Sequence, residues 1–269
     1  MRAAFGLVIF LAFCLGAGAP AARAALPSPY LEELTWTELR DALAAGTTTV
    51  IVPVGGTEQS GPHLALGKHN ARVKVLAGRI ATRLGDTLVA PVVAYVPEGS
   101  ISPPTGHMRF PGTISVSATA FKGVLEGAAE SLKRAGFTHI VLIGDHGGYQ
   151  TLLKEVADHL NHLWTASGAR AHFIAAYYGA AQTAYVRALR AKGLSDAEIG
   201  THAGLADTSL ELATDPAMVR LDRLAAAQGA KSGVAGDPRR ASAALGQLGV
   251  DLIVDETVTA IRKARLDKQ

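Results

Sequence analysis

Short apolar runs rich in β-branched residues alternate along this chain with segments of helical spacing. The apolar runs are residues 47–54, 87–96, 138–143 and 170–178. The segments between them, residues 70–84, 117–135 and 149–164, repeat apolar side chains every three or four positions. A buried parallel strand reads as a continuous apolar run, and a crossover helix reads as a periodic segment. The alternation therefore predicts an α/β fold with a mostly parallel sheet sandwiched between helices.

The first 25 residues differ in composition from the rest of the chain. Arg2 precedes a stretch of apolar and small residues, and an A-x-A cleavage pattern follows at residues 22–24. This order predicts a secretory signal peptide over residues 1–25, a single domain over 26–269, and a secreted or periplasmic location. A membrane anchor is the weaker alternative, because the run is shorter than the roughly 20 residues that span a bilayer.

Charge and cysteine content restrict the partners and the ligands that we expect. The chain has 26 Lys and Arg against 23 Asp and Glu, and two of the arginines lie in the predicted signal peptide. Without a basic block, neither nucleic acid nor, after signal cleavage, a membrane is an expected partner. The single cysteine, Cys14, also lies in the signal segment. A metal site in the mature chain would therefore use histidine and carboxylate ligands.

Polar residues gather after two of the predicted strands. The loop after residues 47–54 contains Glu58 and His69, and residues 145–148 after the third strand include His146. Ligands of parallel sheets bind at the carboxyl ends of the strands, and carboxylates and imidazoles bind metals. Taken separately, the first cluster fits a hydrated loop with helix-capping residues equally well, and a lone strand-end histidine is more often structural. Together they favour a metal site.

A third polar cluster lies at residues 201–209. It contains His202 and Asp207, five residues apart with a glycine between them, which suits a turn into a helix. Thr208 and Ser209 are equally typical of helix caps, so this cluster alone indicates little. The Gly-, Ala- and Arg-rich residues 220–248 predict an irregular surface segment.

Five motifs, in their order along the chain, resemble those of the creatininase family. They are E-Q-S-G-P-H-L-A-L-G from Glu58, G-H followed by F-P-G-T-I-S over 106–115, H-G-G from His146, H-A-G-L-A-D-T-S from His202, and G-V-A-G-D-P-R from Gly233. The resemblance covers roughly residues 30–260. It implies an α/β metal-dependent hydrolase, often hexameric, that attacks non-peptide C–N bonds, commonly in cyclic amides.

The resemblance also implies a metal centre, which in this family usually holds two ions. Glu58 and His146 match ligands of the first ion, whereas His69 stands at the position of a bridging aspartate. Ser60 stands at the position of a histidine that binds the second ion, and Gly148 at that of a further acid. A neutral imidazole has one lone pair and cannot bridge two ions. We therefore expect one divalent ion per subunit, zinc with manganese or iron as alternatives, held by Glu58, His69 and His146.

Catalytic roles follow from the same resemblance. A bound ion would lower the pKa of a water molecule and polarise a substrate carbonyl. His202 matches the family's proton-shuttling histidine, and Asp207 would orient it or complete the metal shell, which Asp145 is also placed to join. The backbone amides of Gly147 and Gly148 would hold the developing oxyanion. Further polar residues expected in the wall of the substrate pocket are Ser60, His63 and His107.

The function expected from these features is metal-dependent hydrolysis of a small cyclic amide by a homo-oligomer. The alternative is a family member with impaired catalysis that binds a small ligand or a metal in the periplasm, which the altered bridging position favours. The retained His202 and Asp207 favour the enzyme, because a binding protein needs no proton shuttle beside a metal. Lactone hydrolysis or peptide cleavage at the same site is a third, weaker possibility.

Overall fold

The computed structural model describes residues 26–228 and 231–266 of the chain. The signal peptide predicted for residues 1–25 lies outside the described residues. Within the described ranges, none of the helices combines the length and the apolar composition that crossing a membrane requires.

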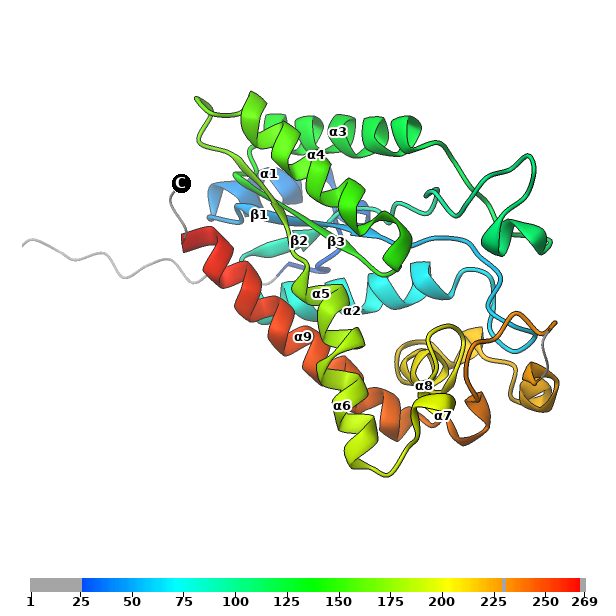
Figure 1. Ribbon diagram of the computed structural model, residues 1–269. Coiled ribbons are helices and arrows are strands. Elements are labelled where there is room, and N and C mark those ends of the chain that lie inside the picture. Colours follow the sequence, from blue (N-terminus) through cyan, green and yellow to red (C-terminus); the bar gives the residue numbers. More distant parts are fainter. Residues whose placement is uncertain (1–25, 229–230, 267–269) are drawn as a thin grey trace, which may run out of the picture.

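Four parallel strands form one sheet in the order β2-β1-β3-β4 (Figure 1). Their bounds are β1 Thr49–Val54, β2 Thr87–Val89, β3 His139–Gly144 and β4 Arg170–Phe173. β1 and β3 pair along their whole length, from Thr49 opposite His139 to Val54 opposite Gly144. The two polar loops that follow these strands therefore leave the sheet side by side.

Helices cover both faces of this sheet (Figure 1). One face carries α1 (Trp36–Ala44), α3 (Ala118–Ala135) and α4 (Gln150–Leu163). The other face carries α2 (Lys68–Leu84), α5 (Ala176–Gln182) and α9 (Ala243–Leu266). Strand side chains alternate between two cores, with Val50 and Val52 in the first and Ile51 and Val141 in the second. This arrangement confirms the predicted parallel α/β sandwich.

The remaining elements lie outside these two layers or connect them. The α-helices are α6 (Ala184–Ala191), α7 (Asp196–Ile199) and α8 (Leu205–Thr214). The 3₁₀ helices are η1 (Leu31–Glu33), η2 (Gly106–Arg109), η3 (Gly147–Tyr149), η4 (Pro216–Met218), η5 (Leu221–Ala227) and η6 (Pro238–Arg240). The segment 220–248, predicted to be irregular, contains η5 and η6, but its last six residues belong to α9.

Two strand predictions extend too far. The run 87–96 is a strand only to Val89, since Pro91 has no N–H group to continue the ladder. The run 170–178 is a strand only to Phe173, and α5 begins at Ala176. Its second half is rich in alanine and packs through Tyr177 into the core shared with α9. An apolar run does not by itself distinguish a buried strand from a buried helix.

Gly246 allows α9 to pack directly against α8. A Cβ atom at this position would lie 1.8 Å from the backbone oxygen of Ser209. We expect Gly246→Ala to lower the free energy of unfolding by about 1–3 kcal/mol, because one helix has to move away from the other. Urea denaturation of the full chain measures this change.

The matched control is Gly123→Ala on the exposed side of α3, where a Cβ atom would meet no other atom within 4 Å. Alanine has the higher helix propensity, so this variant should be as stable as the wild type or more stable, by up to about 1 kcal/mol. Equal stabilities of the two variants would contradict the close contact between α8 and α9.

His139 and His172 lie side by side on β3 and β4, with His139 Nδ1 3.0 Å from His172 Nε2. Burial lowers the pKa of His172 from 6.5 to about 4, with a smaller contribution from His139. Between pH 6.5 and 4, His172 is therefore protonated in the unfolded chain but neutral in the folded chain. The free energy of unfolding should fall as the pH is lowered through this window, because protonation favours the unfolded state.

Replacement by glutamine, His172→Gln, should flatten this part of the stability–pH curve in urea denaturation at pH 7 and pH 5. The control His159→Gln changes an exposed histidine of α4 and should leave the slope unaltered. If the free energy of unfolding of His172→Gln changes with pH as much as that of the wild type, groups other than His172 cause the pH dependence.

Candidate metal centre

Glu58 lies in a loop that folds back onto the end of β1. The Gly56 N–H donates to the Asn70 side-chain oxygen at 2.9 Å, and the Glu58 N–H donates to the Leu66 carbonyl at 3.1 Å. A Cβ atom on Gly56 would lie 2.7 Å from Glu98 Oε1, so glycine permits the close approach of that carboxyl group. The result is a Glu58 side chain with 0% exposure.

Tyr149 fixes the loops after β1 and β3 to each other. Its buried hydroxyl lies 3.1 Å from the N–H groups of both Asp145 and His146, and 2.9 Å and 2.5 Å from the carbonyls of Val54 and Gly55. The hydroxyl accepts from the amides of one loop and donates to a carbonyl of the other. Tyr149 has no predicted role from the sequence, because only the pairing of β1 with β3 brings these four groups together.

His107 reaches the site from η2. Gln59 Nε2 lies 2.8 Å from His107 Nδ1, and Thr113 Oγ1 donates to the His107 carbonyl at 2.9 Å. Thr113 Oγ1 also accepts from the Gln59 N–H at 3.1 Å. These contacts join the segment 106–113 to the Glu58 loop and leave His107 Nε2 directed at Glu58.

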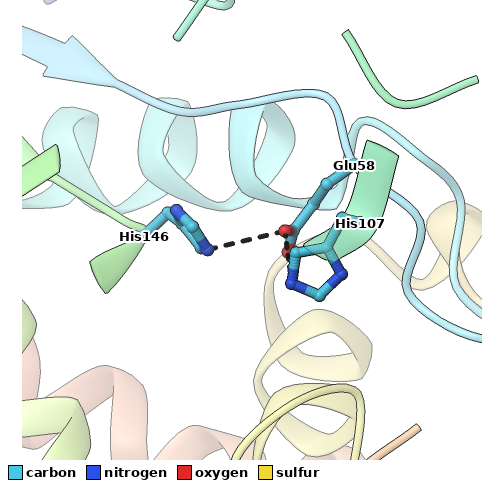
Figure 2. Close-up of side chains that lie close together, drawn as sticks. All are labelled: Glu58, His107 and His146. Carbon is cyan, nitrogen blue, oxygen red and sulfur yellow. Dashed lines mark ion pairs between the residues drawn. The ribbon is translucent and has the colours of Figure 1, made fainter. Parts of the chain in front are cut away.

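Glu58, His107 and His146 form a group suited to a metal ion. Figure 2 shows the two imidazoles on either side of the Glu58 carboxylate. Glu58 Oε2 lies 3.4 Å from His107 Nε2 and 3.5 Å from His146 Nε2, and the ligand atoms all lie within 4.8 Å of one another. Among the described residues, Oε2 has no hydrogen-bond partner although it is buried. Two imidazoles and an orphaned carboxylate oxygen fit a divalent cation.

Burial and neighbouring charges set the ionisation of His146 and Glu58. Burial lowers the pKa of His146 to about 4, with His69 adding to the effect, so the ring is neutral at pH 7. Burial opposes ionisation of Glu58, but the hydrogen bond from His69 and the charge of Lys68 hold its pKa below the usual range. A neutral imidazole and an ionised carboxylate are the forms that ligate metals.

Glu98 is a second buried carboxyl group beside the centre. Its Oε2 lies 3.6 Å from His146 Nδ1. Burial, and then the charge of Glu58 and a side-chain hydrogen bond with it, raise the pKa of Glu98 to about 9, so this carboxyl is neutral at pH 7. Glu98 thus lies on the Nδ1 side of the His146 ring and Glu58 on the Nε2 side. No spacing in the sequence linked Glu98 to His146.

His69, which the sequence predicts as a ligand, lies outside this group, so the geometry favours His107 in its place. Its Nε2 lies 2.8 Å from the other carboxylate oxygen, Glu58 Oε1, and 3.0 Å from Lys68 Nζ, while Nδ1 lies 2.6 Å from Asp145 Oδ2. Both ring nitrogens are therefore engaged by protein groups. His69 and Glu58 share one loop in the sequence, but the fold directs His107 to the side where His146 lies.

Two buried cations lie on the first turns of α2. Lys68 Nζ lies 3.4 Å from Asp207 Oδ2, and the Arg72 guanidinium contacts Asp207 at 3.0 Å and Asp145 at 2.7 Å. Burial alone would raise the pKa of both aspartates, but Arg72 lowers that of Asp145 and Lys68 with Arg72 lowers that of Asp207. Asp145 and Asp207 thus belong to an ion-pair network, outside the metal-binding group. The four-residue spacing of Lys68 and Arg72 on one helix face was the available signal for this network.

His202 lies at the mouth of the site, next to His107 with ring centroids 4.3 Å apart. Its Nε2 lies 3.0 Å from the Gln59 carbonyl, and its Nδ1 lies 3.6 Å from Glu58 Oε1. Burial, and then Lys68, lower the pKa of His202 to about 4. Asp207 accepts from the Ala203 N–H at 2.9 Å. Across the described residues it makes no hydrogen bond to His202, so the expected orienting role is not seen.

A cavity of about 190 Å³ opens beside these groups. The residues that line it include Lys68, His69, Arg72, His107, Asp145, His146, Gly147, Tyr178, His202 and Asp207. Of the expected pocket residues, His107 and Gly147 line the cavity.

The other expected pocket residues lie elsewhere. Ser60 and His63 are buried in the same loop as Glu58, and His63 Nε2 lies 2.9 Å from Thr208 Oγ1. The Gly148 N–H donates to His146 Nδ1 at 3.2 Å, so it is not free to hold an oxyanion. Ser60, His63 and Gly148 therefore do not line the cavity.

Comparisons with known proteins identify one family. The family model Creatininase, described as creatinine amidohydrolase, matches residues 32–261. The chain is 28% identical over 200 residues to creatinine amidohydrolase of Pseudomonas putida, covering 73% of this chain and 76% of that protein. It is 29% identical over 269 residues to the mycofactocin precursor peptide peptidase of Mycobacterium ulcerans (strain Agy99), covering 87% and 92%.

A similar fold is also known from solved structures. A mutant creatininase of the Zn-Zn type superposes with a TM-score of 0.73 at 27% identity, over 89% of this chain and 99% of that one. The family match includes the segments that carry Glu58, His107, His146 and His202. On this evidence the chain belongs to the creatininase family.

Proposed function

We propose that this protein is a metal-dependent amide hydrolase that cleaves a non-peptide C–N bond in a small cyclic amide. One observation carries the proposal: the buried, orphaned oxygen of Glu58 lies between two imidazoles beside a cavity that also contains His202. The named relative from Pseudomonas putida supports amide hydrolysis as the reaction.

The donor set supports a divalent ion held by Glu58, His107 and His146. Two imidazoles and a carboxylate are typical of catalytic zinc, our first choice, and manganese or iron are the alternatives. When bound, the ion supplies Lewis acidity that polarises a carbonyl and lowers the pKa of a water molecule. The Gly148 N–H donates to His146 Nδ1 and holds the ring in its direction, and the Glu98 carboxyl group lies 3.6 Å from the same nitrogen.

His202 is suited to move a proton between water and the leaving nitrogen. His202 Nε2 lies 3.0 Å from the backbone carbonyl of Gln59, which accepts hydrogen bonds, and 3.2 Å from the Gln59 side-chain nitrogen, which donates them. We place the proton of the neutral ring on Nε2, toward the nearer carbonyl. Nδ1 is left with a lone pair, 3.6 Å from Glu58 Oε1. Nδ1 and Glu58 Oε1 are then both acceptors, so a proton donor such as water can bind to both of them. His202 thus takes a proton at Nδ1 and releases it to the nitrogen as the C–N bond breaks.

The cavity favours a compact substrate. At about 190 Å³ it is smaller than the usual ligand pockets of about 300–1,000 Å³. Cleavage of a short peptide is the second candidate, and the similarity to a precursor peptide peptidase over 87% of this chain supports it. A ligand-binding protein without catalysis is the remaining alternative.

Export and assembly stay predictions from the sequence. We propose that the protein acts outside the cytoplasm after cleavage of the signal peptide, and as a homo-oligomer. N-terminal sequencing of the mature protein and analytical ultracentrifugation test these two proposals.

Metal content should depend on His107 and His146. We expect His107→Ala and His146→Ala to lose bound zinc, because each leaves only two ligand atoms at the centre. His69→Ala should retain zinc, and so should the control His159→Ala on the exposed face of α4. Elemental analysis after gel filtration measures the occupancy. Loss of zinc in His69→Ala with retention in His107→Ala would favour the ligand set expected from the sequence.

Turnover should depend on His202. The zinc-, manganese- and iron-loaded protein is assayed with a panel of lactams, cyclic ureides and short peptides. On the best substrate, His202→Asn should lower kcat by about 10²–10⁴-fold, because the proton transfer is lost, while metal content stays unchanged. Turnover of peptides alone would select the second candidate. No turnover of any compound by the metal-loaded wild type would favour the binding protein.

A further inference from the structure

Lys68 is a fully buried cation surrounded by groups of the kinds that bind metals. Its side chain has 0% exposure, and its Nζ lies 3.0 Å from His69 Nε2, 3.4 Å from Asp207 Oδ2 and 3.5 Å from Glu58 Oε1. Carboxylates and imidazoles are the ligand types that hold zinc in proteins. In this chain an ammonium group lies among them instead.

The two oxygens of Glu58 face different positive partners. Oε2 is directed at His107 and His146, where we place the metal ion, and Oε1 is directed at Lys68 and His69. The carboxylate thus lies between the proposed metal position and the Lys68 ammonium. From this geometry we propose that Lys68 takes the place of a second metal ion, so that the centre accepts one divalent cation. This role of Lys68 rests on the metal centre of the proposed function.

The charge of the buried network supports one ion and opposes two. Three carboxylates, Glu58, Asp145 and Asp207, contact two fixed cations, Lys68 and Arg72, and the His69 ring contacts two of the three. These contacts offset most of the negative charge of the network before any metal ion binds. A second ion would bring a large excess of positive charge into a buried site, where it is poorly solvated.

The position of Lys68 on its helix is a separate indication. Lys68 is the first residue of α2, and the first turn contains no acidic residue. A cation at a helix N-terminus is unfavourable, because the helix dipole is positive there. The contacts with Glu58 and Asp207 offset this cost. The ammonium group is therefore stabilised by the carboxylates of the site and not by its position on the helix.

Manganese binding tests the proposal without any measurement of hydrolysis. Full-length wild type, Lys68→Ala and Lys68→Arg are equilibrated with Mn²⁺, and metal content is determined together with the electron paramagnetic resonance spectrum. We expect the wild type and Lys68→Arg, which keeps the charge, to bind one equivalent with the spectrum of an isolated ion. Lys68→Ala should bind two equivalents with the spectrum of a spin-coupled pair, because the oxygens of Glu58 and Asp207 that face Lys68, together with His69 Nε2, then lose their cation.

Spin coupling separates a second ion at the centre from manganese on the protein surface. A coupled pair in the wild type, or a folded Lys68→Ala that binds one equivalent, would overturn the proposal. If Lys68→Ala does not fold by circular dichroism, Lys68→Gln removes the charge with a similar side-chain size, and the same two results decide. A wild type that binds no manganese or zinc would refute the metal centre itself, whereas the absence of turnover would leave the role of Lys68 intact.

Discussion

A carboxylate with no exposure to solvent is stable only beside cations or hydrogen-bond donors, and Glu58 is such a group. Its Oε1 is contacted by His69 and Lys68, whereas its Oε2 lacks a hydrogen-bond partner among the described residues and faces the imidazoles of His107 and His146. A buried carboxylate oxygen without a partner is unfavourable, and a bound cation at Oε2 would remove this cost. The ionisation of the neighbouring groups follows from the same burial.

The scaffold makes this arrangement possible by placing two loops at one edge of the sheet. β1 and β3 are neighbours in register, so Glu58 and His146 leave the sheet close together, and Tyr149 bonds the backbones of both loops. On the opposite side, α2 contributes Lys68 and Arg72, which neutralise Asp145 and Asp207. The metal-binding histidines and the buried ion pairs are therefore two halves of one site, joined by Glu58.

Two residues that depart from the family pattern, His69 and Gly148, make defined contacts in this site. His69, at the position of a bridging aspartate, serves as a hydrogen-bonded link between Glu58 and Asp145. Gly148, at the position of an acid, uses its amide to hold His146, and Glu98 brings a carboxyl group to the same ring from another segment. The site keeps a carboxyl-rich environment, but the groups come from different positions of the chain.

The sequence by itself determined the parallel α/β class, the loops that carry Glu58, His146 and His202, and the family, because apolar periodicity and motif order are local properties. It did not determine where β4 gives way to α5, since residues 170–178 are apolar throughout and either element buries them. Nor did it choose His107 over His69 or reveal Lys68 as a buried cation. Those outcomes depend on which side of the Glu58 carboxylate each side chain approaches. Only the packing of α2 and η2 around the ends of β1 and β3 decides that.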